Sequence, residues 1–175
     1  MGNTSDYFVE GFQPQEGQFL FLHLVHLDKI EEEIYNKKKG VLIVGDNVSD
    51  LVFDTPLIMF LQKRARKVYY AVKREPFRND LSMRDVYGFG LMRGLPVTFV
   101  PGTDYVGIWG EDLERMLEGL GGVDTVIVKG MANYETLSEW VYSVPVIHIM
   151  KTKCRPVSEA IGVRQGSYVI RLFGA

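Results

Sequence analysis

The stretch Val41-Leu42-Ile43-Val44-Gly45-Asp46-Asn47 decides the fold of this 175-residue chain. Its four consecutive Val, Leu and Ile residues are typical of a strand that is buried on both faces of a parallel sheet. Further apolar runs of this kind lie at 67–72, 97–100, 125–128 and 144–149, and a last strand is expected at 167–172. Helical patterns separate the runs at 51–64, 111–120 and 134–142. The alternation predicts an α/β fold, a three-layer αβα sandwich with a mostly parallel, Rossmann-like sheet.

The segment upstream of this strand has a different pattern. Residues 1–17 predict a loose lead-in, and 18–36 predict a helix whose first half is apolar nearly all round. Such a helix is buried on several sides or covered by a partner. We therefore expect a lead-in and helix over 1–40, a single α/β domain over 41–175, and a homodimer held by helix–helix contact.

Composition and charge exclude several classes of protein. The 20 Lys and Arg against 22 Asp and Glu give a net charge of -2, without the basic excess of a general nucleic-acid binder. The basic runs 37–39 and 63–67 fall where helices are expected to end, and cations there complement the helix dipole. With a single cysteine, Cys154, no internal disulfide can form, and we expect a cytoplasmic protein without signal peptide or membrane span.

The histidines favour structural roles over metal binding. His23 and His26 lie three residues apart on one face of the expected helix, but no acidic or Cys partner stands in register with them. His148 lies within an apolar run, so we expect a core histidine with one hydrogen bond.

Polar side chains gather just after the expected strands, where parallel sheets bind their ligands. Asp46 and Asn47 follow the first strand, Asn79 and Asp80 lie beyond the second, and Lys129 follows the fourth. The other polar residues at these strand ends are Asp50, Lys73, Thr103, Asp104, Asn133 and Glu135. Oxygen ligands suit a hard divalent cation and a lysine suits a phosphate, so the set predicts a phosphoryl-transfer site.

Each of these residues also has a purely structural interpretation. Asp46 and Asn47 are candidate caps of the helix that follows them. Asn79 and Asp80 suit a turn and a helix N-cap, and Asn133 stands directly before the helix expected at 134. Their joint placement after successive strands favours the site over the caps.

Four motifs follow one another in order along the chain. They are Leu42-Ile43-Val44-Gly45-Asp46-Asn47 with Val52-Phe53-Asp54, then Asn79-Asp80, then Gly102-Thr103-Asp104, then Lys129-Gly130-Met131-Ala132-Asn133-Tyr134-Glu135-Thr136-Leu137-Ser138. A C-terminal segment with Lys153-Cys154, Pro156 and Gly162-Val163 completes the series. The series resembles the signatures of the damage-control metabolite phosphatases, a family also described as acidic-residue methyltransferase-like and as domain of unknown function 89. The resemblance runs from about Val41 to Ile170.

The resemblance implies a metal-dependent phosphomonoester hydrolase that acts on small phosphorylated metabolites, such as sugar phosphates or cofactor intermediates. It implies that Asp46, Asn47 and Asp80 bind one divalent ion, Mg²⁺ or Mn²⁺, with Co²⁺ or Ni²⁺ as alternatives. Lys129 would contact the phosphate, Asp46 and Lys129 would be catalytic, and the nucleophile is either a metal-bound water or Asp46 itself. We expect substrate contacts from Asp50, Lys73, Asn79, Thr103, Asp104, Asn133 and Glu135.

Two departures from the family pattern motivate other hypotheses. Ser49-Asp50 stands where the family has Gly-Glu, and residues 1–40 stand where the family has a long helical region, so we expect a short member. The second hypothesis is a non-catalytic phosphometabolite-binding or regulatory module that keeps the family sheet. A third, a methyltransferase that acts on carboxyl groups, has no glycine-rich cofactor loop to support it.

Overall fold

The computed structural model describes residues 22–25, 27–36, 40–65, 67–88, 94–95 and 97–173. The strands are β1 (Leu22–Val25), β2 (Gly40–Val44), β3 (Lys67–Val72), β4 (Thr98–Pro101), β5 (Val123–Lys129), β6 (Val146–Lys151) and β7 (Tyr168–Phe173). The helices are α1 (Leu27–Asn36), α2 (Val48–Gln62), α3 (Met83–Gly88), α4 (Gly110–Leu120), α5 (Met131–Leu137) and α6 (Arg155–Ile161).

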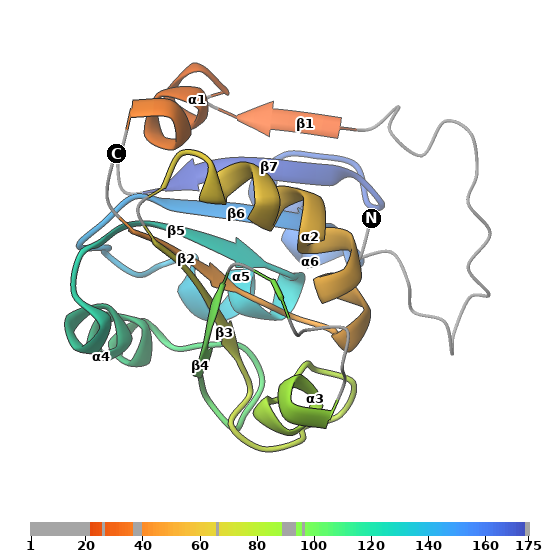
Figure 1. The fold of residues 1–175 in the computed structure, drawn as a ribbon. Helices are drawn as coiled ribbons and strands as arrows, with labels where there is room; N and C mark the ends of the chain where they lie inside the picture. The colour runs from red at the N-terminus through yellow and green to blue at the C-terminus, as the bar shows by residue number, and fades with distance from the viewer. Residues whose placement is uncertain are drawn as a thin grey trace.

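The strands form one sheet in the order β1-β7-β6-β5-β2-β3-β4 (Figure 1). All neighbouring strands are parallel except β6 and β7, which are antiparallel. In the centre, Leu42 of β2 lies between Tyr69 of β3 and Val126 of β5. The mostly parallel α/β sheet predicted from the apolar runs is therefore confirmed.

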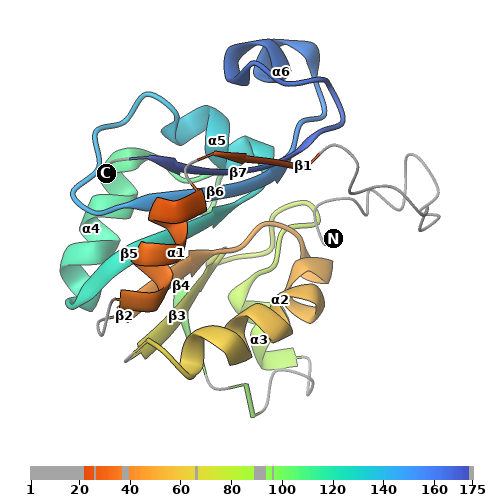
Figure 2. The ribbon, with the colours of Figure 1, turned by 90° about the horizontal axis from the view of Figure 1, so that it is seen from above.

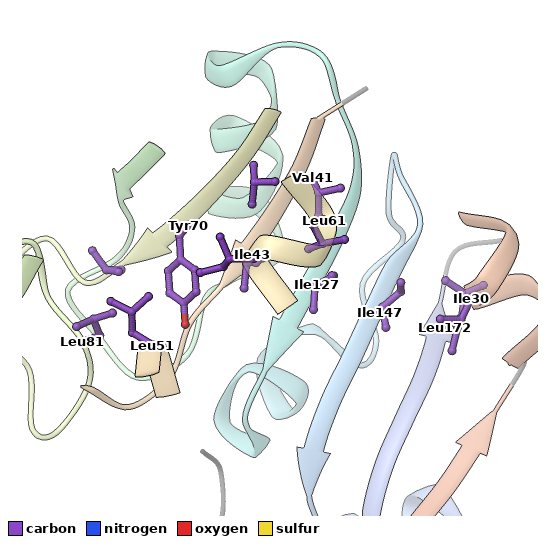
Figure 3. Packing of buried hydrophobic residues seen from close by; sticks show 13 residues of the cluster. Ile30, Val41, Ile43, Leu51, Leu61, Tyr70, Leu81, Ile127, Ile147 and Leu172 are labelled. Atoms are coloured by element: carbon purple, nitrogen blue, oxygen red, sulfur yellow. The ribbon is translucent and has the colours of Figure 1, made fainter. Parts of the chain in front are cut away.

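Helices cover both faces of the sheet (Figure 2). On the face of α1 and α2, residues such as Ile30, Ile58 and Leu61 pack on Ile43 and Tyr70 of the central strands, and Figure 3 shows this cluster. On the opposite face, α4 and α5 close a second core around β2 and β5. The three-layer arrangement leaves the carboxyl ends of β2, β3, β4 and β5 together at one edge.

Several elements differ from the prediction. Residues 22–25 form the edge strand β1, paired with β7, and not the first half of a helix, so the segment before Gly40 joins the same sheet. The strand also removes the helical face on which His23 was placed, while residues 1–21 and His26 lie outside the described part of the chain. The helix expected over 134–142 begins earlier, at Met131, and ends at Leu137.

Two short helices are additional to the prediction. In α3, the Ser82 hydroxyl and backbone N–H both donate to the Asp85 carboxylate, at 2.6 and 2.9 Å, and so cap the first turn. In α6, Pro156 stands in the first turn and Gly162 ends the helix with a φ of 80°. Both caps are local patterns that the strand-based reasoning did not use.

Two further expectations are confirmed, for the basic run at 63–67 and for His148. The basic run at 63–67 starts at Lys63, the residue that ends α2, and the Arg64 guanidinium donates to the Phe60 carbonyl at 3.3 Å; the run at 37–39 lies outside the described residues. His148 is fully buried, and its Nε2 lies 3.4 Å from the Tyr142 hydroxyl. Over the described ranges, each helix is too short or too polar to cross a membrane.

Candidate metal and phosphate site

A backbone bridge joins the end of β2 to the segment between β3 and α3. Asn47 and Asp80 form an isolated antiparallel bridge, and the Leu81 N–H donates to the Asp46 carbonyl at 3.0 Å. The Asn79 side-chain amide donates to Asn47 Oδ1. The bridge therefore places Asp46, Asn47, Asn79 and Asp80 side by side, as the strand-end argument predicts.

The Asp46 carboxylate lies near the carboxylates of Asp50 and Asp80. Removal from water, followed by the charges of Asp50 and Asp80, raises the pKa of Asp46 from 3.8 to about 7. Burial also raises the pKa of Asp80, against the opposing charge of Lys73. A cation bound here would favour the ionised carboxylates and so oppose these shifts.

The donor set fits a hard divalent cation. Asp46 and Asp80 provide carboxylate oxygens and Asn47 provides an amide oxygen, the ligand types of Mg²⁺ and Mn²⁺. Among the described residues, no group of three or more His, Cys, Asp or Glu side chains is placed to hold a metal ion. A site built from two carboxylates and an amide leaves positions open for water and for phosphate oxygens, which suits Mg²⁺.

Gly130 provides the space for the Asp46 carboxylate. Gly130 has a φ of 86°, and a Cβ there would lie 2.2 Å from Asp46 Oδ2. Only glycine combines this backbone conformation with the missing side chain. The glycine of the Lys129-Gly130 motif therefore forms the seat of Asp46, that is, the backbone surface that the Asp46 carboxylate contacts.

A pocket opens beside Asp46 at the carboxyl edge of the sheet. Asp46, Lys73, Thr103 and Asn133 contribute its polar wall, together with backbone of Gly45, Gly102 and Gly107. The Lys73 ammonium donates to Thr103 Oγ1 at 3.3 Å and to the Gly107 carbonyl at 3.0 Å, and lies 3.7 Å from Asp80 Oδ2. Lys73 thus ties the pocket loop to the carboxylate cluster.

Lys129 and Asp50 lie in a buried layer next to this pocket. Lys129 is 5% exposed and Asp50 is fully buried. The Lys129 ammonium lies 2.7 Å from Asp54 Oδ1 and 3.2 Å from Asp50 Oδ2. The buried ammonium is therefore neutralised from inside the protein.

The remaining predicted residues occupy different positions. Asp104 accepts a hydrogen bond from the Glu75 backbone N–H at 3.1 Å, outside the pocket lining, and Glu135 is exposed on α5. Asn133 is not the N-cap of α5, because the helix begins at Met131; its amide donates to the Lys129 carbonyl at 2.7 Å.

The other strand-end residues do not cap helices through their side chains as the structural interpretation expected. Asn47 stands at the N-cap position of α2 but makes no side-chain capping bond there. The Asp80 N–H closes a turn on the Phe77 carbonyl at 3.0 Å, and the first turn of α3 is capped by Ser82 and not by Asn79 or Asp80.

Three residues beyond the predicted set contribute to this region. Asp54 and Tyr70 extend the buried layer, with the Tyr70 hydroxyl donating to Asp54 Oδ2 at 2.6 Å. Lys153, which is exposed beyond β6, lowers the pKa of Asp46 through its charge and so lies near the cluster. Asp54 and Lys153 belong to quoted motifs, but Tyr70 lies within an apolar strand, where no sequence signal sets it apart.

Comparisons with known proteins agree with the strand-end motifs. Residues 5–169 match the model of the damage-control phosphatase ARMT1-like domain. A damage-control phosphatase of Archaeoglobus fulgidus is 28% identical over 98% of this chain, and one of Pyrococcus horikoshii is 30% identical over 97%. An uncharacterized protein of Methanocaldococcus jannaschii is 33% identical over 75% of this chain.

A solved structure shares the fold. The crystal structure of a DUF89 family protein from Pyrococcus horikoshii matches 96% of this chain with a TM-score of 0.75 and 28% identity. The match covers 61% of that crystallised chain. The chain covers 62%, 61% and 44% of the lengths of the curated relatives from Archaeoglobus, Pyrococcus and Methanocaldococcus, so it spans less than two thirds of each.

Proposed function

We propose that this chain, which belongs to the damage-control phosphatase ARMT1-like family, is a divalent-metal-dependent phosphatase that hydrolyses small phosphorylated metabolites. Sugar phosphates and phosphorylated cofactor intermediates are the proposed substrates. The observation that carries the proposal is the bridge between Asn47 and Asp80, which assembles oxygen ligands beside a pocket.

In this proposal Asp46, Asn47 and Asp80 hold one Mg²⁺ or Mn²⁺ ion, with Co²⁺ or Ni²⁺ as substitutes. The cation, when bound, neutralises the charge that develops on the phosphoryl oxygens. Asn79 keeps the amide of Asn47 in place through its hydrogen bond. Gly130 leaves Asp46 room to point at the ligand.

The pocket wall is the proposed seat of the substrate. Thr103 and Asn133 offer a hydroxyl and an amide, and Lys73 keeps the loop of Thr103 fixed. Lys153 contributes positive charge near Asp46, so it is a candidate for the phosphate together with Lys129. Asp104 and Glu135 do not line the pocket, so their predicted contacts require a substrate that extends beyond it. Asp50 does not line the pocket either and is fully buried beside Lys129, which favours a structural role over the predicted substrate contact.

Metal-dependent hydrolysis of p-nitrophenyl phosphate tests the proposal. The full chain is stripped with a chelator and assayed with Mg²⁺, Mn²⁺, Co²⁺ and Ni²⁺ in turn, and then with a panel of sugar phosphates. We expect Asp46→Asn and Asp80→Asn to abolish turnover and weaken Mn²⁺ binding, whereas the control Asp28→Asn, an exposed carboxylate on α1, retains both. A chain without activity with any of the four ions contradicts the proposal.

A second candidate is a phosphometabolite-binding module without turnover. The observation that favours it is Asp50, which replaces the family glutamate and is turned away from the pocket toward Lys129. Calorimetry with a sugar phosphate that shows tight binding, in a chain that hydrolyses no ester, would favour the module over the phosphatase.

The proposed setting is the cytoplasm, with a small metabolite as the partner and neither nucleic acid nor membrane. The homodimer stays a prediction, although the all-apolar helix that motivated it is a strand over 22–25. Light scattering at micromolar concentration measures it directly: a mass near that of one 19.9 kDa chain would contradict the dimer.

A further inference from the structure

Four buried polar side chains from three elements form one connected network. Tyr70 lies on β3, Asp50 and Asp54 lie one turn apart on α2, and Lys129 ends β5. Tyr70 and Asp50 are fully buried, and Asp54 and Lys129 are each 5% exposed. The Tyr70 hydroxyl donates to one oxygen of Asp54 at 2.6 Å, and the other Asp54 oxygen accepts from Lys129 at 2.7 Å.

This network touches the metal-ligand strand on two sides. A Cβ on Gly45, directly before Asp46, would lie 2.5 Å from the Tyr70 ring and 2.9 Å from its hydroxyl oxygen. Gly130, directly after Lys129, seats the Asp46 carboxylate. Tyr70 therefore packs against the backbone at Gly45, directly before Asp46. Lys129 directly precedes Gly130, whose backbone contacts the Asp46 carboxylate.

A contribution to stability does not by itself explain why these buried polar side chains are present. Well-packed apolar side chains of similar volume usually serve a core as well as a buried ion pair does, because burying charges requires their removal from water. A directional network is useful where one charge and one backbone segment must stay in place. The position of this network, next to the proposed metal ligand, supplies that reason.

We propose that Tyr70 and Asp54 are positioning residues that act through Lys129 and Gly45 to hold Asp46 in the geometry for metal binding and turnover. The inference rests on the proposed phosphatase function. The Tyr70 hydroxyl donates a hydrogen bond to one Asp54 oxygen, and the second Asp54 oxygen accepts one from Lys129. Without the hydroxyl, the Asp54 carboxylate is held by Lys129 alone, and the orientation of Lys129 and of the backbone beside Asp46 is less firmly fixed.

Tyr70→Phe in the full chain tests the proposal, with Tyr69→Phe as the matched control. Tyr69 is the next residue on β3, is buried, and packs in the opposite core. Ile58→Val in the core of α2 controls for lost stability, since it removes one buried methyl group without touching the network. Mn²⁺ affinity is measured by calorimetry, and p-nitrophenyl phosphate kinetics are corrected to the folded fraction from near-ultraviolet circular dichroism.

We expect Tyr70→Phe to weaken Mn²⁺ affinity and to lower kcat, each about 10-fold, with KM for the ester within about twofold of the unmodified chain. Asp54→Asn should change both in the same direction, while Tyr69→Phe and Ile58→Val leave both unchanged. If the unmodified chain binds Mn²⁺ and turns over, but Tyr70→Phe matches Tyr69→Phe, the positioning role is wrong and the proposed function stands. If the unmodified chain does neither, the proposed function is wrong.

Discussion

Two groups of carboxylates lie next to each other at the carboxyl edge of the sheet, and they differ in how their charge is balanced. Asp50 and Asp54, on the buried side of α2, share the Lys129 ammonium. Asp46 and Asp80 lie beside the pocket; the Lys73 ammonium lies 3.7 Å from Asp80 Oδ2, and the pKa of Asp46 is raised to about 7. The inner group therefore has a cation from within the protein, whereas the outer group would gain from a bound one.

Removal of the inner cation should have the largest effect. Lys129→Met leaves Asp50 and Asp54 buried without their partner, and we expect the free energy of unfolding to fall by about 3–5 kcal/mol. Urea denaturation monitored by tryptophan fluorescence measures the loss. A loss below about 1 kcal/mol, as for a surface ion pair, would show that Lys129 does not stabilise the two buried carboxylates.

Removal of an outer carboxylate should have the opposite sign in stability. We expect Asp46→Asn to raise the free energy of unfolding of the metal-free chain by roughly 1–3 kcal/mol, because it removes a carboxylate with a raised pKa from a crowd of like charges. The same variant should lose at least about 100-fold in kcat/KM, since Asp46 is a proposed metal ligand.

The stability gain belongs to the metal-free protein alone. Chelator-treated samples in urea measure it, and saturating Mn²⁺ should reverse the order of the two proteins, because only the unmodified chain gains binding energy. Asp28→Asn on α1 is the control and should change neither value. An Asp46→Asn chain that is less stable than its parent without metal would break the distinction between the groups.

The seat of Asp46 gives a third test. Gly130→Ala places a methyl group 2.2 Å from the Asp46 carboxylate and forces alanine to a φ of 86°. We expect a loss of about 2–3 kcal/mol in stability together with weaker Mn²⁺ binding. Gly166→Ala separates the two causes, because Gly166 has a φ of 87° with open space around it. Equal Mn²⁺ affinity in the two variants would contradict a role of Gly130 in seating Asp46.

The outer group was predictable from the sequence, and the inner group was not. The apolar run 41–44 placed β2 in the centre of the sheet, and the parallel direction of β2, β3, β4 and β5 gathered the residues that follow them at one edge. The inner layer depends on which face of β3 and α2 is turned inward. Tyr70 reads as one more apolar residue in 67–72, and only the packing of β3 against α2 directs its hydroxyl at Asp54.

The same reasoning explains the errors in the fold. The residues Leu22–Val25 carry an apolar pattern that suits a strand or a helix, and pairing with the distant β7 decides for the strand. Asn133 has the side chain of an N-cap, but the turn at Gly130 starts α5 at Met131 and places Asn133 inside the helix. In both cases a contact distant in sequence or a special backbone conformation overrides the local preference.

A buried histidine, His148, also contributes to the pH dependence of stability and must be removed before the contribution of the outer group can be measured. Burial, with the charge of Arg171, lowers the pKa of His148 from 6.5 to about 3. The unfolded chain binds a proton here that the folded chain does not, so stability should fall by about 2 kcal/mol between pH 7 and pH 5. Asp46 acts in the opposite direction, since its raised pKa makes the folded metal-free chain bind the extra proton between pH 7 and 4.

His148→Gln should therefore leave a metal-free chain whose stability rises on acidification from pH 7 to 5, measured by urea denaturation at each pH. In the double variant with Asp46→Asn this rise should become smaller, with the remainder due to Asp50 and Asp80, whose pKa values are also raised; a rise of unchanged size would mean that Asp46 is not a group that titrates here.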